Sequence, residues 1–561
     1  MCRFYPFRIP FLTIRKGILG CLCLLLVVTT NTAQPDILDS LTLEQQVAQM
    51  FIVNLYGGQL TEAGRDFLTQ WQPGGVVLIG GNTSTPEQVT QLTNAYQQTI
   101  TAAGGLPLLV AVDQEGGPIT HLRDGFTLFP TPALLTAAGS PELATRVGNA
   151  MAAELAAVGV NLDLAPVADL ETNPQNPIIL RRSFGSDPAL VNPVLAGFVS
   201  GLQAGGVMGT AKHFPGHGAS DTDSHTGLPV VTLSRDELAA RELLPFQAAI
   251  NAGVEAIMVA HIWYPALEPE ENLPATLSHN IVTGLLRDDL GYNGLILTDA
   301  LDMDAIDTVY SYPDAVVRAV EAGVDMVISA HVGLESQAAA IQAVVDAVHA
   351  GQIPESRIQE SVARILAAKA RYGVLDWQPL DENSATERVN AAAHAPLVDE
   401  LFQQGVTVVY DHSDLVPVTA EQRTAMIYPA TRPQIAQECG QYRTDIQWVG
   451  VSDYPQDTEI EWAVSAANRS DTVIVFTQNA VDNSQQQALV RALPPAKTVV
   501  AALYSIYDWK AFPDVAAYVL TYSPERPAVP AVCAVLFGAL PAQGRLPITL
   551  SETLPAGIHD E

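Results

Sequence analysis

Cysteine is scarce in this chain of 561 residues, which contains five. Three of them, Cys2, Cys21 and Cys23, lie near the N-terminus, so that only Cys439 and Cys533 follow. These two can pair, but two cysteines in so long a chain do not make a disulfide framework. No spacing of Cys and His fits a zinc site. The sequence therefore predicts no metal centre.

Basic residues are also few. The chain has 28 Lys and Arg against 60 Asp and Glu, and its formal net charge is -32. Binding of phosphate backbones needs a basic face, so a nucleic-acid partner is excluded. The acidity itself is explained by solubility.

Long apolar runs are missing apart from one near the N-terminus, Ile18 to Val28. It is too short for an ordinary membrane span. Small residues, Thr32-Ala33, follow it, and four basic residues precede it: Arg3, Arg8, Arg15 and Lys16. We expect residues 1–34 to be a secretory signal peptide and the protein to be exported, either outside the cell or into its envelope. Two alternatives stay open: a lipoprotein signal ending at Cys21, and an uncleaved anchor, which is the only membrane contact expected.

Beyond this segment, short apolar runs alternate with helical stretches, and eight of these runs are expected to be strands. Most are continuously apolar, as in a parallel sheet covered on both faces. Eight strand–helix units predict an α/β fold of the (β/α)₈ barrel type over residues 35–376. The expected strands are Met50–Leu55, Gly75–Ile79, Leu108–Val112, Val160–Ala165, Val207–Ala211, Ala256–Ala260, Leu295–Leu297 and Asp325–Ile328.

Two helices can be predicted from local signals. Ser140-Pro141 is an N-cap followed by proline at the first helical position, and Gly159 ends the helix. Its apolar residues recur at helical spacing and form one buried stripe: Leu143, Val147, Met151, Leu155 and Val158. A second helix is expected from Pro354 to Gly373.

The pattern changes after residue 376. A polar stretch, 377–397, is interpreted as a linker, and residues 398–561 as a smaller C-terminal α/β sandwich domain. No glycine-rich phosphate loop occurs there. The strands expected in a parallel sheet of this domain are Val406–Tyr410, Thr472–Phe476, Thr498–Leu503 and Ala517–Leu520.

Polar residues stand where the predicted barrel strands end. Asp113, Lys212-His213, His261 and Asp299 each follow an apolar run. In a (β/α)₈ barrel these strand ends share the catalytic face. An aspartate such as Asp299 is, however, often a helix N-cap.

Asp223 and His225 are two positions apart, so in an extended loop their side chains point to the same side. The carboxylate can orient the imidazole and favour its charged form, which suits a general acid and base. A loop-stabilising hydrogen bond is the alternative. Asp302 and Asp304 are interpreted as solvated or capping acids, and His217 as structural. Arg182 suits either a sugar ligand or an exposed ion pair.

Several motifs together resemble glycoside hydrolase family three, in its β-N-acetylglucosaminidase branch. The resemblance covers about residues 40–375, and the C-terminal segment resembles the family's sandwich domain by architecture only. The motifs are Asp113-Gln114-Glu115-Gly116-Gly117, Arg182-Ser183-Phe184-Gly185, Lys212-His213-Phe214-Pro215-Gly216-His217-Gly218, Asp223-Ser224-His225 and Thr298-Asp299-Ala300-Leu301-Asp302-Met303.

The resemblance implies a retaining, exo-acting β-N-acetylhexosaminidase that removes N-acetylglucosamine from cell-wall fragments or chitooligosaccharides. It implies Asp299 as nucleophile, His225 as acid and base, and Asp223 as its orienting partner. The sugar would be held by the remaining matched residues: Asp113, Arg182, Lys212 and His213. No metal or organic cofactor is implied, and a small carbohydrate is the expected partner. Some relatives use phosphate as acceptor, so phosphorolysis stays open.

The chain departs from the resemblance beside its first motif. Many relatives carry arginines where this sequence has Pro118 and His121, and Arg123 is a possible substitute. A β-glucosidase or β-xylosidase of the same family, and a sugar-binding protein without activity, are the alternatives. The sequence does not indicate an oligomeric state.

Overall fold

The computed structural model describes residues 33–560, and in it eight short parallel strands form one sheet, in the order β10-β1-β2-β3-β6-β7-β8-β9. A bridge between Leu297 and Met326 brings β9 beside β10, so the sheet closes into a barrel. The predicted barrel is confirmed. Its strands are β1 Phe51–Val53, β2 Gly75–Leu78, β3 Leu109–Val112, β6 Leu162–Asp163, β7 Met208–Phe214, β8 Ala256–Val259, β9 Leu295–Thr298 and β10 Val327–Ser329.

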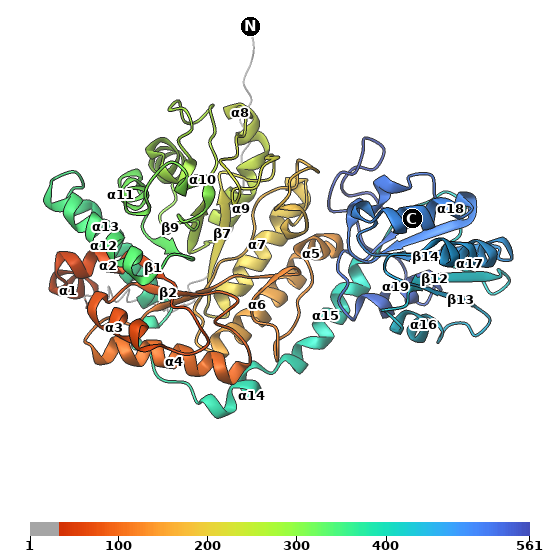
Figure 1. Cartoon of the computed structure of the whole chain (residues 1–561), viewed down its shortest axis with the longest axis horizontal. Coiled ribbons are helices and arrows are strands. Elements are labelled where there is room, and N and C mark those ends of the chain that lie inside the picture. Colours follow the sequence, from red (N-terminus) through yellow and green to blue (C-terminus); the bar gives the residue numbers. More distant parts are fainter. Residues whose placement is uncertain (1–32, 561) are drawn as a thin grey trace, which may run out of the picture.

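Helices surround this sheet on its outer side (Figure 1). They are α1 Ala33–Ser40, α2 Leu43–Gln49, α3 Glu62–Trp71, α4 Pro86–Ala102, α5 Pro132–Ala138, α6 Pro141–Ala157, α7 Pro188–Ala204, α8 Arg235–Glu237, α9 Leu244–Asn251, α10 Asp304–Asp307, α11 Tyr312–Ala322, α12 Leu334–His349 and α13 Glu355–Arg371, with π-helical segments Leu238–Glu242 and Asn280–Asp289. The two helices predicted from local signals are confirmed as α6 and α13. In α6 the Ser140 side chain caps the backbone N–H of Leu143, and the predicted stripe is buried.

The structure differs from the predicted strands in three places. β7 continues through Lys212 and His213 to Phe214, although this stretch was expected to be a loop. The fourth expected strand shrinks to Leu162–Asp163. A small hairpin, β4 Gln114–Gly116 and β5 Ile119–Thr120, was missed, because its residues are polar and glycine-rich and carry no strand periodicity.

The C-terminal domain contains a second sheet of six strands in the order β11-β16-β15-β14-β12-β13. Its strands are β11 Thr407–Asp411, β12 Thr424–Pro429, β13 Gln447–Val451, β14 Thr472–Thr477, β15 Thr498–Ala502 and β16 Ala517–Leu520. β11 pairs antiparallel with β16, so the expectation of an all-parallel sheet was wrong. β12 and β13 were not predicted. The helices of this domain are α16 Gln434–Cys439, α17 Asp457–Asn468, α18 Ser484–Ala492 and α19 Ala528–Leu536.

Two helices connect the domains, α14 Ala385–Val389 and α15 Ala391–Gly405. α15 packs on α5 and bridges the gap between the domains in Figure 1. The expected start of the second domain, residue 398, thus lies inside a helix. The expected signal peptide lies outside the described residues, apart from the first positions of α1. None of the helices in residues 33–560 is both long and apolar enough to span a bilayer.

The two cysteines of the C-terminal domain form a disulfide. It joins Cys439, at the end of α16, to Cys533 in α19, with Cα atoms 5.0 Å apart. Both residues are fully buried. The bond closes a long loop, so it restricts the unfolded chain strongly.

Replacing Cys439 by serine should lower the free energy of unfolding of the C-terminal domain by about 3 kcal/mol, since the unfolded chain gains conformational freedom. Thermal unfolding with and without a reductant measures the effect. The reduced wild type should behave as the variant does. A variant as stable as the oxidised wild type would show that the disulfide contributes nothing.

Candidate active site

One cavity opens at the carboxyl ends of the barrel strands. Its volume is about 370 Å³, and its lining includes Asp113, Arg182, Lys212, His213, His225 and Asp299. Six of the seven predicted site residues are therefore brought together. The seventh, Asp223, does not line the cavity but contacts His225. Residues that sequence reasoning left without a role, among them His121 and His331, lie on the same wall.

Buried ion pairs form part of this wall. Lys212 Nζ lies 2.7 Å from Glu115 Oε1 and 2.5 Å from Asp113 Oδ1. Arg182 donates two hydrogen bonds to Glu115, from Nε at 2.9 Å and from Nη2 at 2.7 Å. Charge-assisted, bidentate pairs of this kind are strong and hold both partners in one orientation.

Glu115 connects both cations, and its side chain is only 1% exposed. Burial alone would raise the pKa of Glu115, but the charges of Arg182 and Lys212 outweigh burial and lower it to about 2. In turn, Asp113 and Glu115 raise the pKa of Lys212 although burial opposes this. Glu115, Arg182 and Lys212 are therefore charged at neutral pH. Arg182 is not in an exposed ion pair, as one reading of the sequence had it, since its side chain is 13% exposed.

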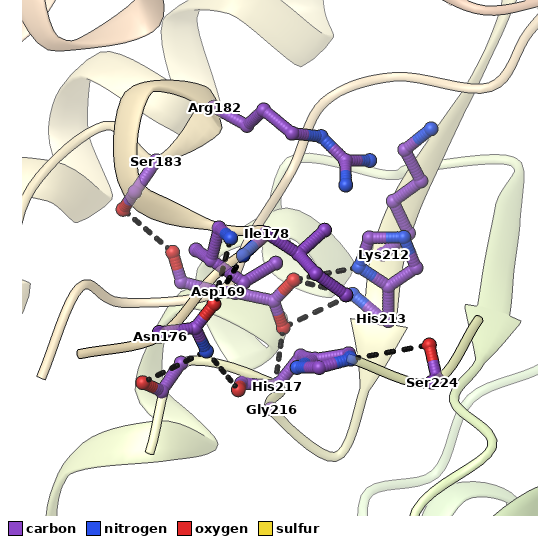
Figure 2. Close-up of polar contacts among 12 residues, drawn as sticks. Asp169, Asn176, Ile178, Arg182, Ser183, Lys212, His213, Gly216, His217 and Ser224 are labelled. Atoms are coloured by element: carbon purple, nitrogen blue, oxygen red, sulfur yellow. Dashed lines mark hydrogen bonds and ion pairs between the residues drawn. The ribbon is translucent and has the colours of Figure 1, made fainter. Parts of the chain in front are cut away.

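Asp169 organises the loop that follows β7. Its carboxylate accepts hydrogen bonds from the backbone N–H groups of His213 and His217, the latter at 2.7 Å, and lies 2.7 Å from His213 Nδ1 (Figure 2). Burial and the nearby Arg182 keep the pKa of His213 well below its usual value, so its ring is neutral. The neutral ring then carries its proton on Nδ1, facing Asp169, and Nε2 is left as an acceptor.

The glycines of the loop after β7 allow close packing. A Cβ on Gly218 would lie 1.5 Å from the carbonyl oxygen of Leu170, so no other residue fits there. Asn176 holds the same loop by donating to the carbonyl oxygens of His217, at 2.9 Å, and Gly218, at 3.3 Å (Figure 2). His217 is buried and structural, as the sequence suggested.

The loop that carries His225 is attached at its middle residue. Ser224 Oγ lies 3.5 Å from His217 Nε2 (Figure 2), and the backbone oxygen of Ser224 accepts from the N–H of Ala305, at 3.3 Å. Asp223 Oδ1 lies 2.7 Å from His225 Nδ1 and accepts from the His225 backbone N–H. The carboxylate thus fixes the imidazole and assigns the proton to Nδ1, which leaves Nε2 for the cavity.

Asp299 directly follows β9. Its Oδ1 accepts a hydrogen bond from the N–H of Ala300, at 2.7 Å. Burial would raise the pKa of Asp299, but the polar groups around it, among them this N–H and the Lys212 ammonium group, outweigh burial and lower it. The site therefore holds an ionised carboxylate and an oriented imidazole on the wall of one sugar-sized cavity.

Sequence reasoning missed Asp169 and Asn176 and assigned Asp302 wrongly. Asp302 is not solvated: its side chain is 6% exposed and accepts from the backbone N–H of His331, at 2.7 Å. A signal for Asp169 existed, because it follows the apolar run 164–168, as Asp113 and Asp299 follow theirs. Its hydrogen-bond partners could not be read from the sequence.

The C-terminal domain supports the loop that leads to Arg182. Tyr507 donates a hydrogen bond to buried Glu171, and Arg181 lies 4.0 Å above the Tyr504 ring. On the far side of Arg182, the backbone N–H of Ser186 donates to the carbonyl oxygen of Pro547, at 3.1 Å. Both sides of this loop are therefore fixed by the second domain.

A closed parallel barrel with a strand-end carboxylate, a histidine–aspartate pair and a polar, sugar-sized cavity at its rim defines a glycoside hydrolase. The chain belongs to glycosyl hydrolase family 3, because the model of that family's N-terminal domain matches residues 42–368. The resemblance seen in the motifs is thereby confirmed.

Among similar proteins, beta-hexosaminidase A of Pseudoalteromonas piscicida is 33% identical over 385 residues, which are 64% of this chain and 64% of that protein. A beta-N-acetylglucosaminidase/beta-glucosidase of Cellulomonas fimi is 31% identical over 388 residues, covering 68% of this chain and 66% of that one. The chain thus matches just under two thirds of each relative's length. The structure of a family 3 β-N-acetylglucosaminidase from Paenibacillus sp. str. FPU-7 has a TM-score of 0.79 and 34% identity, and the match covers 91% of this chain and 99% of that chain.

Replacing Glu115 by glutamine should destabilise the protein by about 3 kcal/mol, because two buried cations lose their shared carboxylate. The lowered pKa of Glu115 gives the sign of the pH effect: its stabilisation is full above its ordinary pKa of 4.5 and is lost as the pH falls towards 2. Chemical denaturation at pH 7 and at pH 3 measures both quantities.

Glu400→Gln is the matched control, since the Glu400–Arg146 pair is exposed. This variant should unfold as the wild type does. Equal stability of Glu115→Gln and the wild type at pH 7 would contradict the role given to Glu115.

Proposed function

We propose that the protein is a retaining, exo-acting β-N-acetylhexosaminidase that removes terminal β-linked N-acetylglucosamine from chitooligosaccharides or cell-wall fragments. The observation that carries this proposal is the position of Asp299 and His225 on the wall of one cavity, with His225 fixed by Asp223. Similar proteins named β-hexosaminidase and β-N-acetylglucosaminidase support the choice of sugar.

In the first step Asp299 attacks the anomeric carbon and a covalent glycosyl-enzyme forms. An ionised carboxylate is required for this attack, and the lowered pKa of Asp299 supplies it. The N–H of Ala300 binds Oδ1 of Asp299, which leaves Oδ2 as the oxygen that attacks the reacting carbon.

His225 serves as the acid and base. It donates a proton to the leaving oxygen as the glycosidic bond breaks, and it then takes a proton from the water that opens the glycosyl-enzyme. Asp223 stabilises the charged imidazole and prevents the ring from turning. The exposed side chain of His225 suits a group that meets both the leaving sugar and the incoming water.

The ion-paired wall binds the terminal sugar. Asp113, the most exposed carboxylate of the cluster at 24%, accepts from sugar hydroxyl groups, while Lys212 holds it in place. Arg182 and Lys212 donate to the sugar where they reach it. His213 accepts through Nε2. Charged groups that are already fixed in place need no reorganisation to form hydrogen bonds. They therefore stabilise the transition state more than water would.

Export is part of the proposal. The basic and apolar N-terminal segment supports it, and so does the Cys439–Cys533 bond, because disulfides persist mainly in oxidising compartments. Outside the cytoplasm the protein meets cell-wall fragments and chitooligosaccharides, which are then its carbohydrate partners.

His225→Ala should slow cleavage of a disaccharide by about 100-fold, because a sugar alkoxide is a poor leaving group and needs a proton. An aryl glycoside with an acidic phenol should be slowed far less in its first step. Burst and steady-state rates on both substrates measure the difference. Equal slowing would contradict the role of proton donor.

The choice of sugar is tested with a matched pair, an aryl β-N-acetylglucosaminide and the corresponding aryl β-glucoside. We expect kcat/KM to be higher for the N-acetylglucosaminide and to be lost in Asp299→Asn. Faster turnover of the glucoside would make the protein a β-glucosidase, the second activity in the name of the Cellulomonas fimi relative. Release of a sugar 1-phosphate in phosphate buffer would show that the enzyme is a phosphorylase. Unchanged activity in Asp299→Asn would show that Asp299 is not the nucleophile.

A further inference from the structure

A second histidine–carboxylate pair lies on the cavity wall. His331 Nδ1 lies 3.2 Å from Asp302 Oδ2, and the His331 backbone N–H donates to the same oxygen at 2.7 Å. Asp302 is buried, whereas the His331 side chain is 63% exposed. The pair therefore presents an oriented imidazole, with Nε2 free to exchange hydrogen bonds with a ligand.

An exposed aromatic ring lies beside this pair. Tyr56 follows β1, His331 follows β10, and the two strands are neighbours in the barrel. The Tyr56 hydroxyl donates to the carbonyl oxygen of Ala330 at 3.4 Å, and the residue is 51% exposed. Tyr56, Asp302 and His331, here called the rim cluster, thus combine a flat apolar surface with a hydrogen-bonding group. Sugar rings, with apolar faces and polar edges, fit such a combination.

The rim cluster spans the carboxyl ends of β9, β10 and β1, which Asp302, His331 and Tyr56 follow. The loop of His225 reaches the same edge, because the backbone oxygen of Ser224 accepts from the N–H of Ala305, three residues after Asp302. The buried ion pairs of Glu115, Arg182 and Lys212 form the inner wall, whereas His225 and His331 are both more than half exposed. An exo-acting enzyme holds the terminal sugar in the inner part, so the next sugar unit lies at the mouth, beside these two exposed histidines.

The charges of the cavity select against an anionic ligand at this position. Among the described residues that line it, the two permanent cations, Arg182 and Lys212, are both held in ion pairs. Asp299 lines the cavity and Asp302 pairs with His331, and both carry acidic groups. A carboxylate on the second sugar would thus lose hydration without gaining an unpaired permanent cation as partner.

We propose that Tyr56 and His331, with Asp302 as the positioning residue of His331, bind the sugar unit next to the scissile bond and favour an uncharged one, such as a second N-acetylglucosamine, over one that carries a carboxylate. This inference rests on the proposed function, since it assigns the leaving-group side of the same site.

His331→Ala is tested on chitotriose and on an aryl N-acetylglucosaminide, whose small leaving group reaches less of the mouth. The ratio of kcat/KM for chitotriose to kcat/KM for the aryl glycoside should fall about fivefold, mainly through KM, because one hydrogen bond is lost. His331→Gln should restore part of the ratio, since its amide forms a similar bond.

His349→Ala is the matched control. His349 is also exposed, but it ends α12, the helix that starts beside the His331 loop, and so lies at the opposite end of the barrel. The ratio of kcat/KM for chitotriose to kcat/KM for the aryl glycoside should be the same in His349→Ala as in the wild type. An unchanged ratio in His331→Ala overturns the inference but leaves the proposed function standing. A wild type that cleaves neither substrate overturns both.

The charge selection is tested on the wild type with two open-chain substrates, N,N′-diacetylchitobiitol and the corresponding aldonic acid. They share the glycosidic bond and differ in the carboxylate of the leaving unit. The alditol should have the higher kcat/KM, by about fivefold at low salt, and the difference should shrink at high salt. Equal rates, or faster cleavage of the acid, would overturn the charge part of the inference.

Discussion

The site depends on one buried carboxylate, Glu115. It pairs with a guanidinium group from the loop before α7 and with an ammonium group from β7, and so it compensates part of the charge of both buried cations. Because the cluster is almost closed to water, its charges are fixed in place before a substrate arrives. Asp113, at the exposed end of the cluster, is held by Lys212 and lines the cavity. The arrangement is rigid because each charge has a partner.

The other half of the site is held by hydrogen bonds to the backbone. The Asp169 carboxylate accepts hydrogen bonds from the backbone N–H groups of His213 and His217, and the Asn176 amide donates to the carbonyl oxygen of His217. The loop with His225 is attached to this support through Ser220 and Ser224, while the His225 side chain is exposed. Asp299 is thus held by a backbone hydrogen bond, whereas the His225 imidazole is exposed and oriented by Asp223.

The second domain contacts the loop that carries Arg182. Tyr507, Tyr504 and the chain around Pro547 contact the loop on both sides of Arg182, and so they limit where the guanidinium group can move. The Cys439–Cys533 bond concerns the stability of the second domain instead, and neither cysteine lines the cavity.

Much of the fold follows from local signals. Apolar runs of strand length and caps such as Ser140-Pro141 predicted the barrel, because they depend on residues close together in the chain. The barrel rule then placed Asp113, Lys212 and Asp299 on one face, and the two-residue spacing paired Asp223 with His225. Which charges pair was decided only by the tertiary structure: Arg182 meets Glu115 across 67 positions, and Lys212 meets Asp113 across 99. The same holds for Asp302, which looked like a surface acid until the fold brought the loop of His331 over it. The sequence pattern predicts to which side of its own strand or helix a side chain points. Its interaction partner lies on another segment, and only the tertiary structure brings the two segments together.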